Sequence, residues 1–182
     1  MEKYNFSIRD YDKLTIIRKK LVNEILGTEI DFKPDVVELI LKLKSLGFII
    51  ILATMTTQEQ LEVYYKTNEK MLKQMNIEKT FDLILKIDDV ENKKPHPEIF
   101  NKIVQHYNAK SDECLIFEDS YTGVLAGNNA GIEVVNIYDK YADVDRDKIN
   151  EITDYSIIKY KEFIDLVKTL YLTKQKIYNE RI

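Results

Sequence analysis

Hydrophobic and polar positions follow two patterns along the chain. In the first, apolar residues recur every three or four positions, as on one face of an amphipathic helix. It begins with Leu14, Ile17, Leu21 and Ile25. It returns over residues 34–46, 57–75, 97–107, 120–131 and 163–170. The pattern predicts helices in these segments, and the glycines at positions 27, 47 and 131 are typical of helix ends.

The second pattern is a short apolar run, seen over residues 48–53, 83–85, 114–117 and 134–137. Such runs are typical of parallel strands that are covered on both faces. Because strands and helices alternate, the chain is predicted to have an α/β fold, with a Rossmann-like, doubly wound parallel sheet. Ligands of such folds bind outside the carboxyl ends of the strands. The functional residues are therefore sought at those ends.

Composition narrows the classes of partner and location. The chain has 182 residues, and its 27 Lys and Arg against 31 Asp and Glu give a net charge of −4. It has no basic block that would follow a nucleic-acid backbone, and no apolar run long enough to span a bilayer. Its one cysteine, Cys114, lies in an apolar run and suits a reducing compartment. We expect a soluble, cytoplasmic protein that binds neither nucleic acid nor membrane.

Polar residues follow two of the predicted strands directly. Thr54 ends one run, where its hydroxyl and the N–H of Met55 could donate to a phosphate oxygen. Glu118 and Asp119 end another, next to a predicted helix start, and carboxylate oxygens there suit a hard cation such as Mg²⁺. The structural alternatives are a simple turn at Thr54, and a helix cap provided by Asp119 or Ser120.

Two further features surround these strand ends. Lys94 precedes Pro95 in a loop that two prolines stiffen, so its ammonium could face a phosphate charge; a solvated surface lysine is the alternative. The helix after Ser120 carries a set of small residues that would let it lie close to the sheet: Gly123, Ala126, Gly127, Ala130 and Gly131. His96 and Cys114 have no partner motif and are not expected to act in a site.

Three motifs in this order resemble those of the haloacid dehalogenase superfamily, in the branch of phosphoglycolate phosphatases and β-phosphoglucomutases. They are the apolar strand ending at Thr54, the segment Lys94-Pro95-His96-Pro97-Glu98-Ile99-Phe100, and Phe117-Glu118-Asp119-Ser120 with Gly123-Val124 and Ala130-Gly131. The resemblance covers about residues 34–158. It implies a Mg²⁺-dependent phosphatase or phosphomutase that acts on a small phosphorylated metabolite.

The same resemblance assigns roles to five residues. It implies that Thr54 and the Met55 amide hold the phosphoryl group, and that Lys94 stabilises its charge. It further implies that Asp119 binds Mg²⁺ and that Glu118 supports the metal shell. Thr54 and Lys94 would thereby be the catalytic residues of the recognisable motifs.

The first motif of the superfamily, an apolar strand running into Asp-x-Asp-Gly-Thr, has no clear counterpart. In that motif the first Asp forms an aspartyl-phosphate and the second is the general acid and base. Asp10-Tyr11-Asp12 has the spacing, and Tyr4, Phe6 and Ile8 alternate before it, but Lys13 replaces the glycine. Polar residues at positions 5, 7 and 9 would also be buried in a central strand. Asp10 and Asp12 are therefore the less favoured nucleophile and acid.

We favour instead a division in which residues 1–30 are the remnant of a helical cap segment, residues 31–160 the α/β core, and residues 161–182 a C-terminal helix and tail. The catalytic strand would then lie outside this polypeptide, and its absence would leave unpaired backbone groups in the sheet. Three hypotheses follow: an N-terminally shortened enzyme, a non-catalytic descendant that binds phosphate or protein, and a chain whose missing strand comes from a second copy or another polypeptide.

Overall fold

The computed structural model describes residues 8–153 and 155–167, with side chains from residue 11 onward. Its strands are β1 (Ile51–Ala53), β2 (Leu83–Leu85), β3 (Leu115–Glu118), β4 (Glu133–Ile137) and β5 (Tyr155–Ile157). Its α-helices are α1 (Ile8–Thr28), α2 (Val36–Ser45), α3 (Gln58–Lys66), α4 (Glu69–Gln74), α5 (Ile77–Thr80), α6 (Glu98–Tyr107), α7 (Tyr121–Asn129) and α8 (Arg146–Ile152). Short 3-10 helices cover Ile87–Asp89, Ser111–Glu113 and Lys140–Asp145, and residues 160–167 are also helical.

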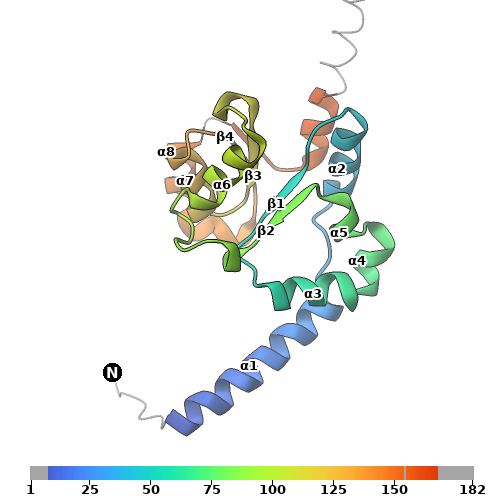
Figure 1. Ribbon diagram of the computed structural model, residues 1–182, viewed down its shortest axis with the longest axis vertical. Coiled ribbons are helices and arrows are strands. Elements are labelled where there is room, and N and C mark those ends of the chain that lie inside the picture. Colours follow the sequence, from blue (N-terminus) through green and yellow to red (C-terminus); the bar gives the residue numbers. More distant parts are fainter. Residues whose placement is uncertain (1–7, 154, 168–182) are drawn as a thin grey trace, which may run out of the picture.

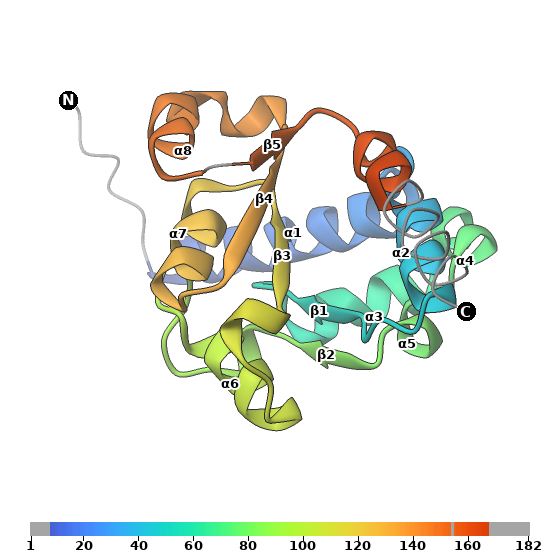
Figure 2. The same cartoon turned by 90° about the horizontal axis from the view of Figure 1, so that it is seen from above.

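All strand pairs in the described part of the chain are parallel, which confirms the predicted α/β class. The strands form two groups, β1 with β2, and β3 with β4 and β5 (Figures 1 and 2). Within the described residues, β1 and β3 are not paired with each other. The expected parallel sheet is therefore divided between these two strands, where the missing first-motif strand was expected to leave unpaired backbone.

Helices cover both sides of the larger group of strands. Figure 2 shows α7 and α8 on one side of β3 and β4, with the helix of residues 160–167 on the other. Val124 of α7 and Ile149 of α8 pack on Val134 of β4. On the opposite side the rings of Phe117 and Phe163 meet edge to face, with centroids 4.8 Å apart. This two-sided cover is the doubly wound arrangement that the apolar strands predicted.

A shared apolar cluster joins the two groups of strands. Ile99 and Phe100 of α6 are buried in it together with Ala126 and Ile132. Ala53 of β1, Leu85 of β2 and Ile116 of β3 pack against the same cluster. The carboxyl ends of β1 and β3 are therefore held near each other although no backbone ladder connects them.

Two predicted elements differ in extent. The apolar run over residues 48–53 becomes a strand only at Ile51–Ala53, and Phe48 and Ile49 stay 58% and 56% exposed. The ladder with β2 joins only Ile51–Ala53 and Leu83–Leu85. The long helix predicted over residues 57–75 is two helices, because buried Asn68 caps α4 and sends its amide to the carbonyls of Leu26 and Ile30.

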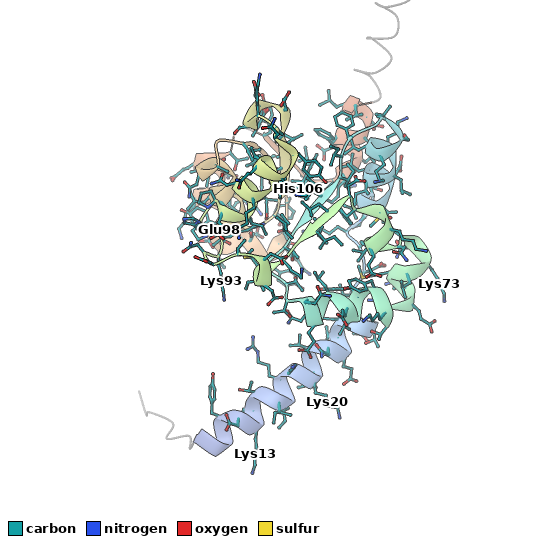
Figure 3. The ribbon with its side chains drawn as sticks, in the orientation of Figure 1. Lys13, Lys20, Lys73, Lys93, Glu98 and His106 are labelled. Atoms are coloured by element: carbon teal, nitrogen blue, oxygen red, sulfur yellow. The ribbon has the colours of Figure 1, made fainter. Side chains whose placement is uncertain are left out.

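Helix α1 is long, and it points away from the body of the molecule (Figure 1). Lys13 and Lys20 mark its outer part in Figure 3. Its apolar stripe is partly exposed at Leu14, Ile17, Leu21 and Ile25. The helix predicted from that stripe is confirmed, and it ends at Thr28. Among the described residues no helix combines the length and hydropathy that crossing a membrane requires.

Candidate functional site

Lys94 connects the carboxyl ends of the two strand groups. Its ammonium donates to the carbonyl oxygen of Ala53 at 3.2 Å and forms an ion pair with the Glu118 carboxylate. It also lies 4.8 Å from the ring centroid of Phe100. The side chain of Lys94 is 7% exposed, so the alternative that it is a solvated surface lysine is wrong. The lysine thereby brings the motifs at Thr54, Lys94 and Glu118 to one place.

The Glu118 carboxylate lies under the first turn of α7. Ser120 is the N-cap of that helix and accepts a hydrogen bond from the N–H of Gly123 at 3.1 Å. A Cβ atom on Gly123 would collide with the Glu118 carboxylate, so the small residue is needed for this close approach. Because Ser120 caps the helix, the carboxylate of Asp119 is not used for capping.

The small-residue face of α7 is confirmed with one correction. A Cβ on Gly127 would lie 2.5 Å from Cγ2 of Val134 and 3.0 Å from Cδ1 of Ile116, so this helix does pack closely on β3 and β4. Gly131 has no atom within 4 Å of such a Cβ and has a φ of 67°. Gly131 therefore forms the left-handed turn after the helix. The prediction that it belongs to the face packed on the sheet is wrong.

Asp119 faces a second carboxylate across a lysine. The ammonium of Lys33, from the segment between α1 and α2, lies 2.7 Å from Oδ2 of Asp119 and 2.5 Å from Oδ2 of Asp139. Asp119 follows β3 and Asp139 follows the neighbouring strand β4. Two carboxylates from adjacent strand ends therefore converge on a single cationic group.

Two buried polar residues hold the backbone at these strand ends. Asn136 is fully buried in β4, and its amide donates to the carbonyl of Glu118 at 3.1 Å. Arg146 donates to Oδ1 of Asn136 at 3.1 Å and to the carbonyl of Asp139 at 3.0 Å. The positions of both acidic strand ends are thus coupled through one hydrogen-bonded chain.

Thr54 begins the turn after β1. Its hydroxyl donates to Oγ1 of Thr56 at 2.8 Å and accepts from the Thr56 N–H at 3.1 Å. Met55 is half-buried against the apolar cluster of α6. The structure thus shows the turn role of Thr54, and it places that hydroxyl one residue from the carbonyl that Lys94 contacts.

The charges around Asp119 affect one another. Burial opposes the charge of Lys33, but the hydrogen bonds to Asp119 and Asp139 outweigh it and raise the pKa of Lys33. The Lys33 hydrogen bond in turn holds the pKa of Asp139 below its usual value. Tyr160, which lies near these groups, has its pKa raised to about 12, chiefly by burial. Lys33 and Asp139 therefore remain an ion pair at neutral pH.

The oxygen donors suit a magnesium ion. In the described part of the chain no group of three or more His, Cys, Asp or Glu side chains converges as a complete metal site. Mg²⁺, however, is commonly held by one or two carboxylates, with waters and substrate phosphate completing its shell. Asp119 and Asp139 meet that requirement, since they already share one cation. The carboxylate of Glu118, the residue before Asp119, is instead paired with Lys94.

Asp10 and Asp12 lie elsewhere. Both belong to α1, so the hypothesis that residues 8–12 continue a strand into an Asp-x-Asp motif is wrong. Asp12 is exposed on the outer part of α1, next to the labelled Lys13 in Figure 3. The side chain of Asp10, and the residues Tyr4 and Phe6, lie outside the described part of the chain.

Sequence reasoning missed the four residues that complete this site, Lys33, Asn136, Asp139 and Arg146. Asp139 follows a predicted strand by two residues, so the rule that located Thr54 and Asp119 would also have located it. Asn136 interrupts an apolar run, which is a signal for a buried polar role. Lys33 carries no such signal, because it lies in a connection between two helices.

Comparisons with known proteins show the family of the chain. Residues 1–137 match the family described as haloacid dehalogenase-like hydrolase. The chain is 31% identical over 166 residues to a phosphorylated carbohydrates phosphatase of Thermotoga maritima, covering 90% of this chain and 68% of that protein. It is 28% identical over 138 residues to pyrophosphatase PpaX of Bacillus thuringiensis, covering 70% of this chain and 61% of the relative. The chain thus spans roughly two thirds of the length of these curated relatives.

Solved structures share the fold at lower identity. CbbY from Rhodobacter sphaeroides, solved in complex with phosphate, superposes with a TM-score of 0.70 at 19% identity, covering 88% of this chain and 68% of that one. β-Phosphoglucomutase from Clostridium difficile superposes with a TM-score of 0.63 at 22% identity, covering 94% and 73%. These two structures therefore support the fold of the strands and helices that carry the site.

Proposed function

The chain belongs to the haloacid dehalogenase-like hydrolase family, a family of phosphatases and phosphomutases, and from this premise we propose that it binds the phosphoryl group of a small phosphate monoester beside Lys94. The observation that carries the proposal is the contact of Lys94 with both Ala53 and Glu118. Folds of this kind bind their ligands at the carboxyl ends of the parallel strands. A buried ammonium at that place attracts an anion.

Thr54 and Met55 would complete the phosphoryl site. Rotation of the Thr54 hydroxyl away from Thr56 would let it donate to a phosphate oxygen, together with the N–H of Met55. Lys94 would neutralise the charge that develops on the phosphoryl oxygens. Support comes from the adjacency of Thr54 to Ala53, whose carbonyl already accepts from Lys94.

We propose Mg²⁺ as the cofactor, with Asp119 as its ligand and Glu118 supporting the shell by holding Lys94. When bound, the metal would offset phosphate charge and orient the phosphoryl group. Asn136 would keep the carbonyl of Glu118, and with it the start of the Asp119 segment, in a constant position. The convergence of Asp119 and Asp139 on one cation supports this assignment.

The covalent step needs a nucleophile, and the proposal places it on a strand between β1 and β3. In the described residues β1 pairs only with β2, and the free edge of β3 faces away from β4. A parallel strand seated there would end beside Lys94 and Thr54. Sequence beyond the described residues, a second copy or another polypeptide could supply it. Specific activity that rises with protein concentration would identify a second copy as its source.

A non-catalytic descendant that binds phosphate or protein is the second candidate. It is favoured by one observation. Asp12, the acid and base of the less favoured Asp-x-Asp motif, is exposed on α1, so this motif is not placed for catalysis at the strand ends. Phosphomutase activity is a further alternative within the family. For the substrate, the relative named for phosphorylated carbohydrates makes a sugar phosphate the first compound to test. A cytoplasmic location stays a prediction.

One experiment separates a phosphatase from a non-catalytic descendant. Hydrolysis of p-nitrophenyl phosphate is measured with and without Mg²⁺, while binding of inorganic phosphate is followed by calorimetry. A phosphatase is expected to show Mg²⁺-dependent turnover that Asp119→Asn abolishes and Asp12→Asn leaves unchanged. Thr54→Val is expected to weaken phosphate binding about tenfold, the loss of about one hydrogen bond to a charged group. Binding without turnover favours the non-catalytic descendant, and absence of both overturns the proposal.

A further inference from the structure

Lys33 lies where a metal ion bound to Asp119 would be. Its ammonium is 2.7 Å from Asp119 and 2.5 Å from Asp139, in each case at atom Oδ2. Metal–oxygen bonds of a magnesium ion are shorter, about 2.0–2.1 Å, but a metal ion held by Asp119 and Asp139 would take its oxygens from the same two carboxylates. An ammonium and a metal ion cannot occupy the space between these two oxygens together.

The lysine is charged and accessible enough to exchange. It lies between two carboxylates as an ammonium, and a lysine side chain is positively charged at neutral pH. The side chains of Lys33, Asp119 and Asp139 are 35%, 42% and 21% exposed. Ion pairs that water can reach are weak, because solvent screens the attraction and the long lysine side chain loses freedom. A divalent cation can therefore compete with Lys33, and Lys33 can weaken its binding.

We propose that Lys33 is an internal competitor of the divalent cation: its ammonium and the metal ion bind the Asp119 and Asp139 carboxylates alternately. The proposal rests on the proposed function only in taking Asp119 as a metal ligand. It adds Asp139 as a second ligand and Lys33 as the group that lowers metal affinity. Binding of the metal then requires the segment between α1 and α2 to release Lys33 from the strand ends.

Lys94, the other lysine at the strand ends, is held more firmly than Lys33. Lys94 is 7% exposed, packs over Phe100 and also donates to Ala53, so it is fixed by three contacts. Lys33 contacts two carboxylates and lies in a connection without regular structure. Of the two lysines at the strand ends, Lys33 is therefore the one that can leave.

The test is direct Mn²⁺ binding to the purified chain, measured from the electron paramagnetic resonance signal of the free ion. Lys33→Met removes the charge and keeps an unbranched side chain, and it is expected to bind Mn²⁺ at least tenfold tighter than the unmodified chain. Lys33→Arg keeps the charge and is expected to bind as weakly as the unmodified chain. Adding Asp139→Asn to Lys33→Met is expected to remove most of the gain.

Lys44→Met is the matched control, because Lys44 forms an ion pair with Asp82 at 2.8 Å and the two side chains are 31% and 39% exposed. It changes net charge equally and is expected to leave Mn²⁺ affinity unchanged. Equal affinities of Lys33→Met and the unmodified chain overturn the proposal, as does an equal gain in Lys44→Met. If Lys33→Met does not fold by circular dichroism, Lys33→Gln replaces it with the same expected gain.

The readout is independent of catalysis. A gain of Mn²⁺ affinity in Lys33→Met, in a chain that neither binds inorganic phosphate nor hydrolyses a phosphate ester, supports the competition and contradicts the proposed function. Turnover in the unmodified chain, with equal metal affinity in the two proteins, supports the proposed function and overturns the competition.

Discussion

The ammonium of Lys94 and the carboxylate of Glu118 form an ion pair whose side chains are 7% and 13% exposed. A pair so far from water is stable only while both partners are present, because either charge alone would be buried without compensation. The pair also joins the loop before α6 to the end of β3. The geometry of the proposed phosphoryl site and the stability of the fold are therefore linked at this contact.

Removing one partner of this pair is expected to be costly. Lys94→Met leaves the Glu118 carboxylate buried and unpaired, and we expect the free energy of unfolding to fall by about 3–5 kcal/mol. Urea denaturation measures it. The double variant Lys94→Met with Glu118→Gln is expected to recover part of the loss. A fall below about 1 kcal/mol in the single variant, as expected for Lys44→Met, would show that the pair is solvated.

The approach of α7 to the sheet is expected to tolerate no methyl group at Gly127. Its Cβ would lie 2.5 Å from Val134, a stiff buried side chain. We expect Gly127→Ala to lower the free energy of unfolding by about 1–3 kcal/mol, the range for overpacking, although alanine favours helices. In the Val134→Ala background the same change should cost much less. Additive effects of the two substitutions would contradict the proposed collision.

Buried Asn68 is expected to contribute more than an ordinary helix cap. It caps α4 and also binds the carbonyls of Leu26 and Ile30 at 2.8 and 2.9 Å. Asn68→Ala should cost about 1 kcal/mol for the cap, and about 1–3 kcal/mol more for carbonyls left without a donor. Asn76→Ala removes only the cap of α5 and is the matched control. Equal losses in the two variants, measured by thermal unfolding, would show that the contacts to Leu26 and Ile30 contribute nothing.

Glu98 is expected to make stability depend on pH in the acid range. The N–H of Glu91 donates to its carboxylate, Lys102 pairs with it, and Asn92 donates to it as well, which lowers its pKa from 4.5 to about 2. The labelled Glu98 lies near Lys93 in Figure 3, beside this loop. Because the folded state binds the proton less readily than the unfolded state, its contribution is complete above about pH 4.5 and is lost as the pH falls toward 2.

The measurement for Glu98 is the difference in unfolding free energy between the unmodified chain and Glu98→Gln. The difference is expected to be constant from pH 7 to pH 5 and to shrink steadily below pH 4.5. Lys102→Met removes one of the carboxylate's partners and should therefore raise the pH at which the contribution of Glu98 is lost. A difference that is the same at pH 3 and pH 7 would mean that the loop contacts do not depend on the charge of Glu98.

The sequence by itself determined most of the elements and their order, because the signals for these are local; it did not predict α5, α8 or β5. Apolar spacing located α1, α2, α6 and α7, and short apolar runs located the cores of β1 to β4. The capping box of Thr57 and Gln60 was readable from four neighbouring residues and is present in the structure. The strand-end rule located Thr54 and Asp119 for the same reason, since strand ends are local features.

The tertiary structure alone decided what depends on distant residues. Asn68 breaks the helix predicted over residues 57–75 because it binds carbonyls about forty positions earlier in the chain. The sheet is divided between β1 and β3 because neither has a partner there among the described residues. Lys33 reaches Asp119 and Asp139 across more than eighty positions, and no spacing along the chain encodes such a contact. Local pattern sets the elements, and long-range packing and charge set the site.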